Sequence, residues 1–137
     1  MKNLVYYLGI GSVIVLLLAN CNSTNTAVNS NNTKEEPVVI KNDSLEYEII
    51  ILDPGFNTYL LTIARPEGYF SKVYLENRNQ LYVPVWNMRV SNPSRYNPNI
   101  YCNLIDYDPN IDYGYEVNFK LFNYFQFAEQ KYRMRLR

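Results

Sequence analysis

The apolar residues of this chain change their spacing along the sequence, and each change predicts a different element of secondary structure. Residues 45–52, LEYEIIIL, are β-branched and apolar and lead into an Asp-Pro-Gly turn, which predicts a buried strand. Residues 56–64 predict a short helix that stops at the proline and glycine of residues 65–68. A second strand is predicted over residues 100–107, IYCNLIDY, after a proline-containing loop.

A helical period spans the middle of the chain, from Tyr69 to about Val90. Apolar residues recur there at every third or fourth position, with charged residues between them. Pro84 lacks an N–H group and its ring clashes with the preceding turn, so we expect it to kink this helix or to split it near Tyr82. A strand over part of residues 81–90 is the alternative for the second half.

The most apolar helix is predicted near the C-terminus, over residues 113–132. Its apolar face is wider than that of an ordinary amphipathic helix, because additional phenylalanines flank the stripe. The residues concerned are Val117, Phe119, Leu121, Phe122, Phe125, Phe127, Ala128 and Tyr132. Because a domain this short has few other residues with which to cover that face, we expect part of it to be exposed and to bind a partner.

Residues 131–137, KYRMRLR, alternate basic and apolar side chains, which fits either a short edge strand or the frayed end of the last helix. The predicted order is therefore strand, helix, helix, strand and helix, with a short C-terminal strand as an option. This order indicates a small single domain of the α+β class, or of the α/β class if the two strands are parallel neighbours. In the parallel arrangement Asp53 and Asp108 would lie at the same edge of the sheet, where ligands usually bind.

The N-terminal third differs in composition from the rest of the chain. Residues 1–20 contain an apolar run shorter than the roughly 20 residues that a membrane span needs, so they predict a secretory signal peptide. Residues 21–44 have few large apolar side chains, and such a segment cannot bury enough surface to offset the entropy lost on ordering. We therefore expect a flexible polar tether over residues 21–44 and a globular domain over residues 45–137.

The signal-like segment ends in the sequence Leu18-Ala19-Asn20-Cys21. This sequence resembles the lipobox of bacterial lipoproteins, in which the cysteine thiol receives a diacylglycerol and cleavage leaves the cysteine as the new N-terminus. The resemblance implies a signal peptide of the lipoprotein type, lipid attachment at Cys21 and a membrane anchor. The polar residues that follow Cys21 favour the side of the membrane that faces the periplasm. A secreted protein cleaved nearby and an uncleaved anchor are the alternatives.

Composition argues against several classes of function. The chain has 13 basic and 13 acidic residues, so no strong positive field points to nucleic acid. It contains no histidine, which argues against zinc sites and Ser-His-Asp chemistry. With Cys21 lipidated, Cys102 would be the remaining thiol, and we expect it to be buried and inert on a strand shared with Ile100 and Leu104. No catalytic motif is recognisable, so we expect a protein that is not an enzyme.

The sequence IDYDPNIDYG places Asp106, Asp108, Asn110 and Asp112 at every second position. Calcium loops of the EF-hand type use oxygen ligands at alternate positions, and these residues match the first half of that pattern. Two diagnostic positions do not match, because Ile111 stands where the loop requires glycine and the glutamate comes one position early. The alternative is a rigid turn that caps the last helix, since Asp and Asn accept backbone N–H bonds. Calcium is the one cofactor that this sequence suggests.

Three stretches carry a wider resemblance: EYEIIILDPGFNTYL, YLENRNQLYVPVWNMRV and IDYDPNIDYGYEVNFKLFNYF. Together they resemble a family of small Bacteroidetes envelope lipoproteins, of the flavobacterial type, that contains a domain of unknown function. The resemblance covers about residues 45–136 and is most specific at residues 53–56, 86–87 and 106–114. It implies a bacterial lipoprotein and brings no activity with it.

These observations lead to one functional expectation and two alternatives. We expect a lipid-anchored protein of the cell envelope that acts as a non-enzymatic interaction or accessory module, through an envelope protein partner or through self-association. The first alternative is a calcium-binding envelope domain that uses residues 106–112. The second is a small hydrolase that acts on envelope polymers through the carboxylates of Asp53 and Asp108.

Overall fold

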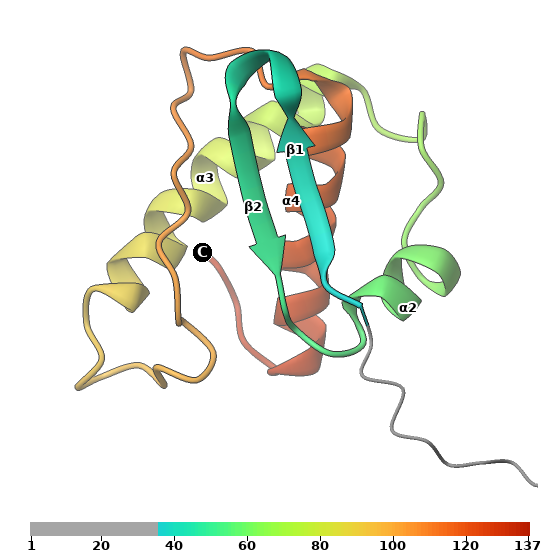
Figure 1. The fold of residues 1–137 in the computed structure, drawn as a ribbon. Coiled ribbons are helices and arrows are strands. Elements are labelled where there is room, and N and C mark those ends of the chain that lie inside the picture. Colours follow the sequence, from blue (N-terminus) through green and yellow to red (C-terminus); the bar gives the residue numbers. More distant parts are fainter. Residues whose placement is uncertain (1–35) are drawn as a thin grey trace, which may run out of the picture. The chain divides into compact units, whose positions relative to one another are not determined.

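The computed structural model describes residues 36–137, which form a small α+β domain, as the sequence predicted (Figure 1). Its elements are strand β1 (Val38–Asn42), the 3-10 turn η1 (Asp43–Leu45), strand β2 (Tyr47–Ile51) and helices α2 (Phe56–Thr62), α3 (Lys72–Val90) and α4 (Gly114–Lys131). The predicted signal peptide, the lipid site at Cys21 and most of the tether lie outside the described residues. Within the described range, no helix has the length and apolar character of a membrane span.

β1 and β2 form an antiparallel hairpin, and no other strand joins them in the described part of the chain. Ile40 and Ile49 lie opposite each other and contribute to the core. Their outward neighbours, Val39 and Ile50, form the next pair, and Ile50 is exposed. The hairpin turn begins at Asn42, whose side-chain oxygen accepts a hydrogen bond from the backbone N–H of Ser44 at 3.0 Å.

β1 corrects the expected boundary of the tether. The sequence predicts a flexible segment up to residue 44, but residues 38–42 form a strand and Ile40 is fully buried. Three apolar residues between Pro37 and Lys41 are too few to indicate a strand by periodicity, because the strand depends on pairing with β2 and on contact with α4. The prediction of parallel neighbouring strands, and with it the α/β alternative, is wrong because the sheet is antiparallel.

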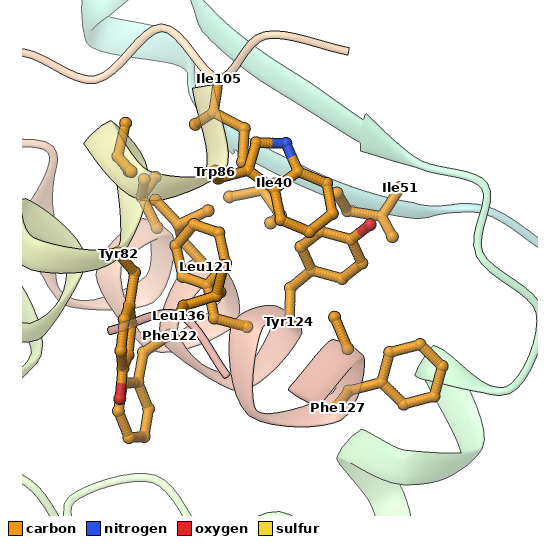
Figure 2. Close-up of a cluster of buried hydrophobic side chains, with 14 of the residues drawn as sticks. Ile40, Ile51, Tyr82, Trp86, Ile105, Leu121, Phe122, Tyr124, Phe127 and Leu136 are labelled. Carbon is orange, nitrogen blue, oxygen red and sulfur yellow. The ribbon is translucent and has the colours of Figure 1, made fainter. Parts of the chain in front are cut away.

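α4 is the central element of the domain, and the hairpin, α2 and α3 all contact it (Figure 1). Phe119, Phe122 and Phe127, which widen its apolar face, are all buried, and Figure 2 shows Phe122 and Phe127 within the cluster of core side chains. Phe56 of α2 covers one end of this face through edge and tilted contacts with Tyr124 and Phe127. The expectation that part of the α4 face is exposed for a partner is therefore wrong.

α3 runs without interruption through Pro84, so the predicted split and the alternative strand over residues 81–90 are both wrong. Pro84 removes one hydrogen bond from the helix, but its ring lies on the exposed side. Its neighbours Val83 and Trp86 are buried in the core, and their packing holds the helix in place across the proline.

Residues 100–107 do not form the predicted strand. They pass alongside β2 in Figure 1, but no backbone–backbone hydrogen bond among the described residues joins them to it. The side chains of Trp86 and Asn87 attach this segment to α3 instead. The polypeptide therefore follows a strand-like path beside the sheet without becoming part of it.

The C-terminal residues adopt neither of the two forms predicted for them. Arg133 takes a left-handed φ of 50°, and residues 134–137 have no regular structure. Leu136 is buried in the core, and its backbone N–H donates to Glu129 Oε1 at 2.7 Å. The tail therefore folds back onto the domain.

Candidate functional site

A groove with a volume of about 680 Å³ lies between β2 and residues 99–106. β2 and its flanking residues form one wall, and residues 99–106 form the other. Trp86 of α3 and Tyr124 of α4 are nearly buried and form its floor. In Figure 2 the rings of these two residues lie between Ile51 and Ile105. We call this feature the β2 groove.

Exposed apolar side chains mark both walls of the β2 groove. On the sheet side Ile50 is 49% and Leu52 is 74% exposed, and on the opposite side Leu104 is 65% exposed. Isolated apolar side chains are common on protein surfaces, whereas several around one concave site indicate a binding surface. The groove is therefore a candidate site for an apolar part of a ligand.

Two side chains of α3 hold the outer wall of the β2 groove in place. The Asn87 amide donates to the backbone oxygen of Ile105 at 2.8 Å, and its side-chain oxygen accepts from the Ile105 N–H at 2.9 Å. Trp86 Nε1 donates to the backbone oxygen of Asn103 at 3.0 Å. These bonds occupy backbone groups that a strand would offer to β2, which explains why residues 100–107 do not pair with it.

The edge of β2 that faces the groove has backbone groups without a strand partner in the described part of the chain. At the other edge of the hairpin, Lys120 Nζ donates to the Val39 oxygen at 3.3 Å, so this carbonyl points away from β2. In an antiparallel pair, opposite residues direct their N–H and C=O groups either toward each other or away from each other. Ile50 is opposite Val39, so its backbone groups point into the groove, as do those of Glu48 two positions earlier.

The β2 groove is acidic. Its lining contains Glu46, Glu48, Asp53 and Asp106 and no Lys or Arg residue. Asp53 is neutralised by Lys131, whose Nζ lies 2.5 Å from Asp53 Oδ1. The other three carboxylates are exposed and form no ion pair with any of the described residues. The groove therefore attracts cationic groups.

Tyr124 and Tyr132 bring phenol groups into the lining of the groove. The Tyr132 hydroxyl donates to the Asp53 carboxylate, 2.9 Å from Oδ1 and 2.8 Å from Oδ2. Burial raises the pKa of both phenols well above its ordinary value, and the adjacent Asp53 carboxylate raises it further. Both side chains therefore stay neutral and offer apolar and hydrogen-bonding contacts rather than a base.

Cys102 also lies in the groove lining and is exposed, so the expectation of a buried thiol is wrong. The expectation assumed that Cys102 alternates with its neighbours on a strand, and that strand does not form. An exposed thiol in the groove allows chemical labelling of this site.

Asp112, at the end of the acidic turn, is held by the protein itself. Its Oδ2 accepts a hydrogen bond from Lys72 Nζ at 2.6 Å, and its Oδ1 accepts from the Gly114 N–H at 2.9 Å. The hydrogen bond from Lys72 lowers the pKa of the Asp112 carboxyl, which therefore stays ionised to lower pH than an isolated aspartate. The interaction with Gly114 places Asp112 at the start of α4.

Asp108 and Asn110 form a local turn before α4. Asp108 Oδ1 accepts hydrogen bonds from the backbone N–H and the side-chain amide of Asn110, at 2.8 and 2.9 Å. Asp106 belongs instead to the lining of the β2 groove. No group of three or more acidic, cysteine or histidine side chains within residues 36–137 is arranged to hold a metal ion. This geometry fits a turn that precedes a helix, and calcium binding stays a prediction from the sequence.

Asp53 and Asp108 do not form a shared site. Asp53 contacts Lys131 at the C-terminal end of α4, whereas the Asp108 N–H donates to the Tyr113 hydroxyl at the other end of this helix. α4 has 18 residues and is therefore roughly 27 Å long. The predicted carboxylate cluster is wrong, because the two aspartates do not follow parallel neighbouring strands.

Comparison with protein families matches residues 8–137 to a family of unknown function, DUF6146. The chain belongs to this family. The DUF6146 match includes every residue of the β2 groove and of the acidic turn, and it confirms the expectation of a domain of unknown function. Searches of curated proteins and of solved structures found no match.

Proposed function

We propose that this DUF6146 protein is a lipid-anchored, non-enzymatic interaction module of the bacterial cell envelope, facing the periplasm, and that it binds an envelope protein through the β2 groove. The observation that supports binding is the groove itself, which combines exposed apolar side chains with an edge of β2 that has no strand partner among residues 36–137. Its volume of about 680 Å³ lies within the range of roughly 300–1,000 Å³ that is common for ligand sites.

The chemistry of the groove supports binding rather than catalysis. Tyr124 and Tyr132 stay protonated because their pKa values are raised, and Asp53 is held by Lys131 and Tyr132. These groups are suited to orienting a ligand by hydrogen bonds. A general base needs a pKa near the working pH, which neither phenol has.

The test of the proposed interaction compares two exposed leucines in the full-length protein, crosslinked in its own membranes. Leu104 in the groove is 65% exposed and Leu81 on α3, outside the groove lining, is 61% exposed. Losing a buried leucine contact weakens binding by about tenfold or more. We expect the wild type and Leu81→Ser to crosslink to the same envelope protein with the same yield. We expect Leu104→Ser to give about one tenth of that crosslinking yield or less. Equal yields from both variants, or crosslinks only between copies of this chain, would overturn the proposal.

The lipid anchor is supported by the lipobox-like sequence that ends at Cys21. Metabolic labelling with palmitate tests it independently of the groove. We expect the label in the wild type and in Cys102→Ser, and no label in Cys21→Ser. Labelling that persists in Cys21→Ser would remove the anchor from the proposal.

A further inference from the structure

Building on the function proposed above, we infer that the ligand of the β2 groove is an extended segment of a partner protein in which basic and apolar residues alternate. The segment adds to the free edge of β2 as a third strand. The free backbone groups of β2, the fixed opposite wall and the charge of the lining each point to this ligand.

The backbone of β2 supplies the first argument. The N–H and C=O groups of Glu48 and Ile50 point into the groove, because the carbonyl of Val39 on the opposite strand points away from the hairpin. An exposed strand edge of this kind pairs with any extended chain that reaches it. Peptide ligands in many protein families bind by adding a strand in this way.

The second wall determines the form of the ligand. Residues 99–106 lie opposite β2 and are fixed to α3 by Trp86 and Asn87. The sheet edge of a second folded copy would bring its own covering side chains against this wall. A single extended chain needs only the spacing of about 4.8 Å between neighbouring strands. The groove therefore suits one strand rather than a folded domain.

The third argument is charge and pattern. Side chains of an added strand point alternately to the two faces of the sheet. On the inner face they meet Trp86 and Tyr124, which favour apolar residues. On the outer face they lie beside Glu48, with Glu46 and Asp106 also in the lining. These carboxylates form no ion pair within the described part of the chain, and they favour Lys or Arg. A strand that alternates apolar and basic residues satisfies both faces.

The C-terminal residues of this chain also alternate basic and apolar side chains, but they pack against their own domain. Leu136 is buried in the core of its own domain, and its N–H is bound to Glu129. The Arg135 backbone oxygen accepts a hydrogen bond from Arg89. Insertion of this tail into a second copy would break these contacts, so we assign the ligand to a different protein.

The test uses the full-length protein in phospholipid nanodiscs and a synthetic probe with blocked ends. The probe is a peptide of alternating Lys and Val, about seven residues long, which is enough to span a short strand and its flanks. At about ten times its Kd, we expect the peptide to slow alkylation of Cys102 by roughly tenfold, because the labelling site is then mostly covered. The amides of Glu48 and Ile50 should gain protection from hydrogen exchange.

Two N-methylated peptides form the matched control for strand addition. One carries N-methyl groups on the residues whose N–H groups face β2, and the other carries them on the remaining residues. We expect only the first to lose protection of Cys102, because only it loses hydrogen bonds to Glu48 and Ile50. Equal protection by both peptides, or equal protection by palmitate alone, would show that the groove binds side chains or lipid and would overturn the inference.

A second pair of variants tests the charge argument without changing the core. Glu48 lies in the groove lining, and Glu67 is exposed and outside it. We expect Glu48→Gln to weaken binding of the Lys-Val peptide by about threefold or more at low salt, and Glu67→Gln to leave it unchanged. Equal affinities for the two variants, or equally tight binding of a Glu-Val peptide, would contradict the choice of a basic ligand.

These outcomes separate the inference from the proposed function. If crosslinking to an envelope protein depends on Leu104 but the Lys-Val peptide does not bind, the inference fails and the proposed function stands. If the peptide binds as a strand but no crosslink depends on Leu104, the inference about the ligand is supported and the proposed function in the envelope fails.

Discussion

Asn87 is one of the two side chains that hold the outer wall of the β2 groove in place. Its amide contacts both backbone polar groups of Ile105, at 2.8 and 2.9 Å, and so imitates the two hydrogen bonds that a neighbouring strand would make. The same segment would otherwise have its N–H and C=O groups available for β2. Asn87 thereby keeps the segment apart from the sheet and leaves space between them.

We expect Asn87→Ala to lower the free energy of unfolding by about 1–3 kcal/mol, since both backbone groups of Ile105 lose their partner. Urea denaturation followed by Trp86 fluorescence measures this change. Asn99 lies in the same wall, is exposed, and its side chain makes no hydrogen bond to the described residues. Asn99→Ala should therefore change stability by less than about 0.5 kcal/mol. If Asn99→Ala lowered the free energy of unfolding as much as Asn87→Ala, the role given to Asn87 would be contradicted.

At the scale of elements, the contribution of β1 to stability is the one least evident from the sequence. Ile40 is fully buried in the core around α4, and Ile49, which lies opposite it, is partly buried and packs against this core. Its neighbour Val39 lies on the other face of the strand. The two residues therefore allow a comparison within one short strand.

We expect Ile40→Ala to lower the free energy of unfolding by about 2–5 kcal/mol, because it leaves a cavity in the core. Val39→Ala, on the outward face, should cost less than about 1 kcal/mol. Chemical denaturation of the full-length variants gives both values. If the two substitutions had the same small effect, β1 would be dispensable and the domain would begin after residue 44.

The helices could be predicted from the sequence because their signals are local. α2 and α4 follow from apolar spacing and from the turn residues around them, and α3 follows from the same period in spite of Pro84. Strands depend on a partner that spacing does not reveal. Residues 38–42 acquire a partner and become β1, whereas residues 100–107 have strand-like spacing but bind α3 through Asn87.

The sequence predicts some residues of the β2 groove but not the groove itself. Asp53 and Asp106 stand out in the sequence and both line it, but Asp53 is neutralised by Lys131 rather than paired with Asp108. The apolar residues of 45–52 predict a buried strand, whereas the structure covers one face of β2 and leaves the other open. Whether an apolar side chain is covered depends on distant segments, so its spacing alone could not show the groove.

At the scale of the whole molecule, one core around α4 joins the two strands and three helices of the described part. The buried side chain of Asn79 on α3 donates to the backbone and side-chain oxygens of Asn118 on α4, at 3.0 and 3.1 Å. Trp86 reaches from α3 into the same core and contacts Tyr124 of α4. Within the described residues, both strands and all three helices contribute buried side chains to this core, so the domain should unfold as a unit.

We therefore expect a single cooperative transition in urea. Trp86, the only tryptophan in the chain, reports on the core by fluorescence, and far-UV circular dichroism reports on the helices. Both signals should change at the same urea concentration, as in other small two-state domains. A fluorescence change that precedes the loss of helix would contradict this expectation and would indicate that the groove wall opens first.

The carboxylates beside β2 have a further consequence for a protein that would be concentrated on a membrane surface. An open strand edge is a template on which identical chains polymerise into fibrils. If two copies met through β2 with Glu48 opposite Glu48, the two side chains would come close together and repel each other. The same negative charge that, by our inference, favours a cationic strand would therefore also oppose amyloid-like assembly of the protein with itself.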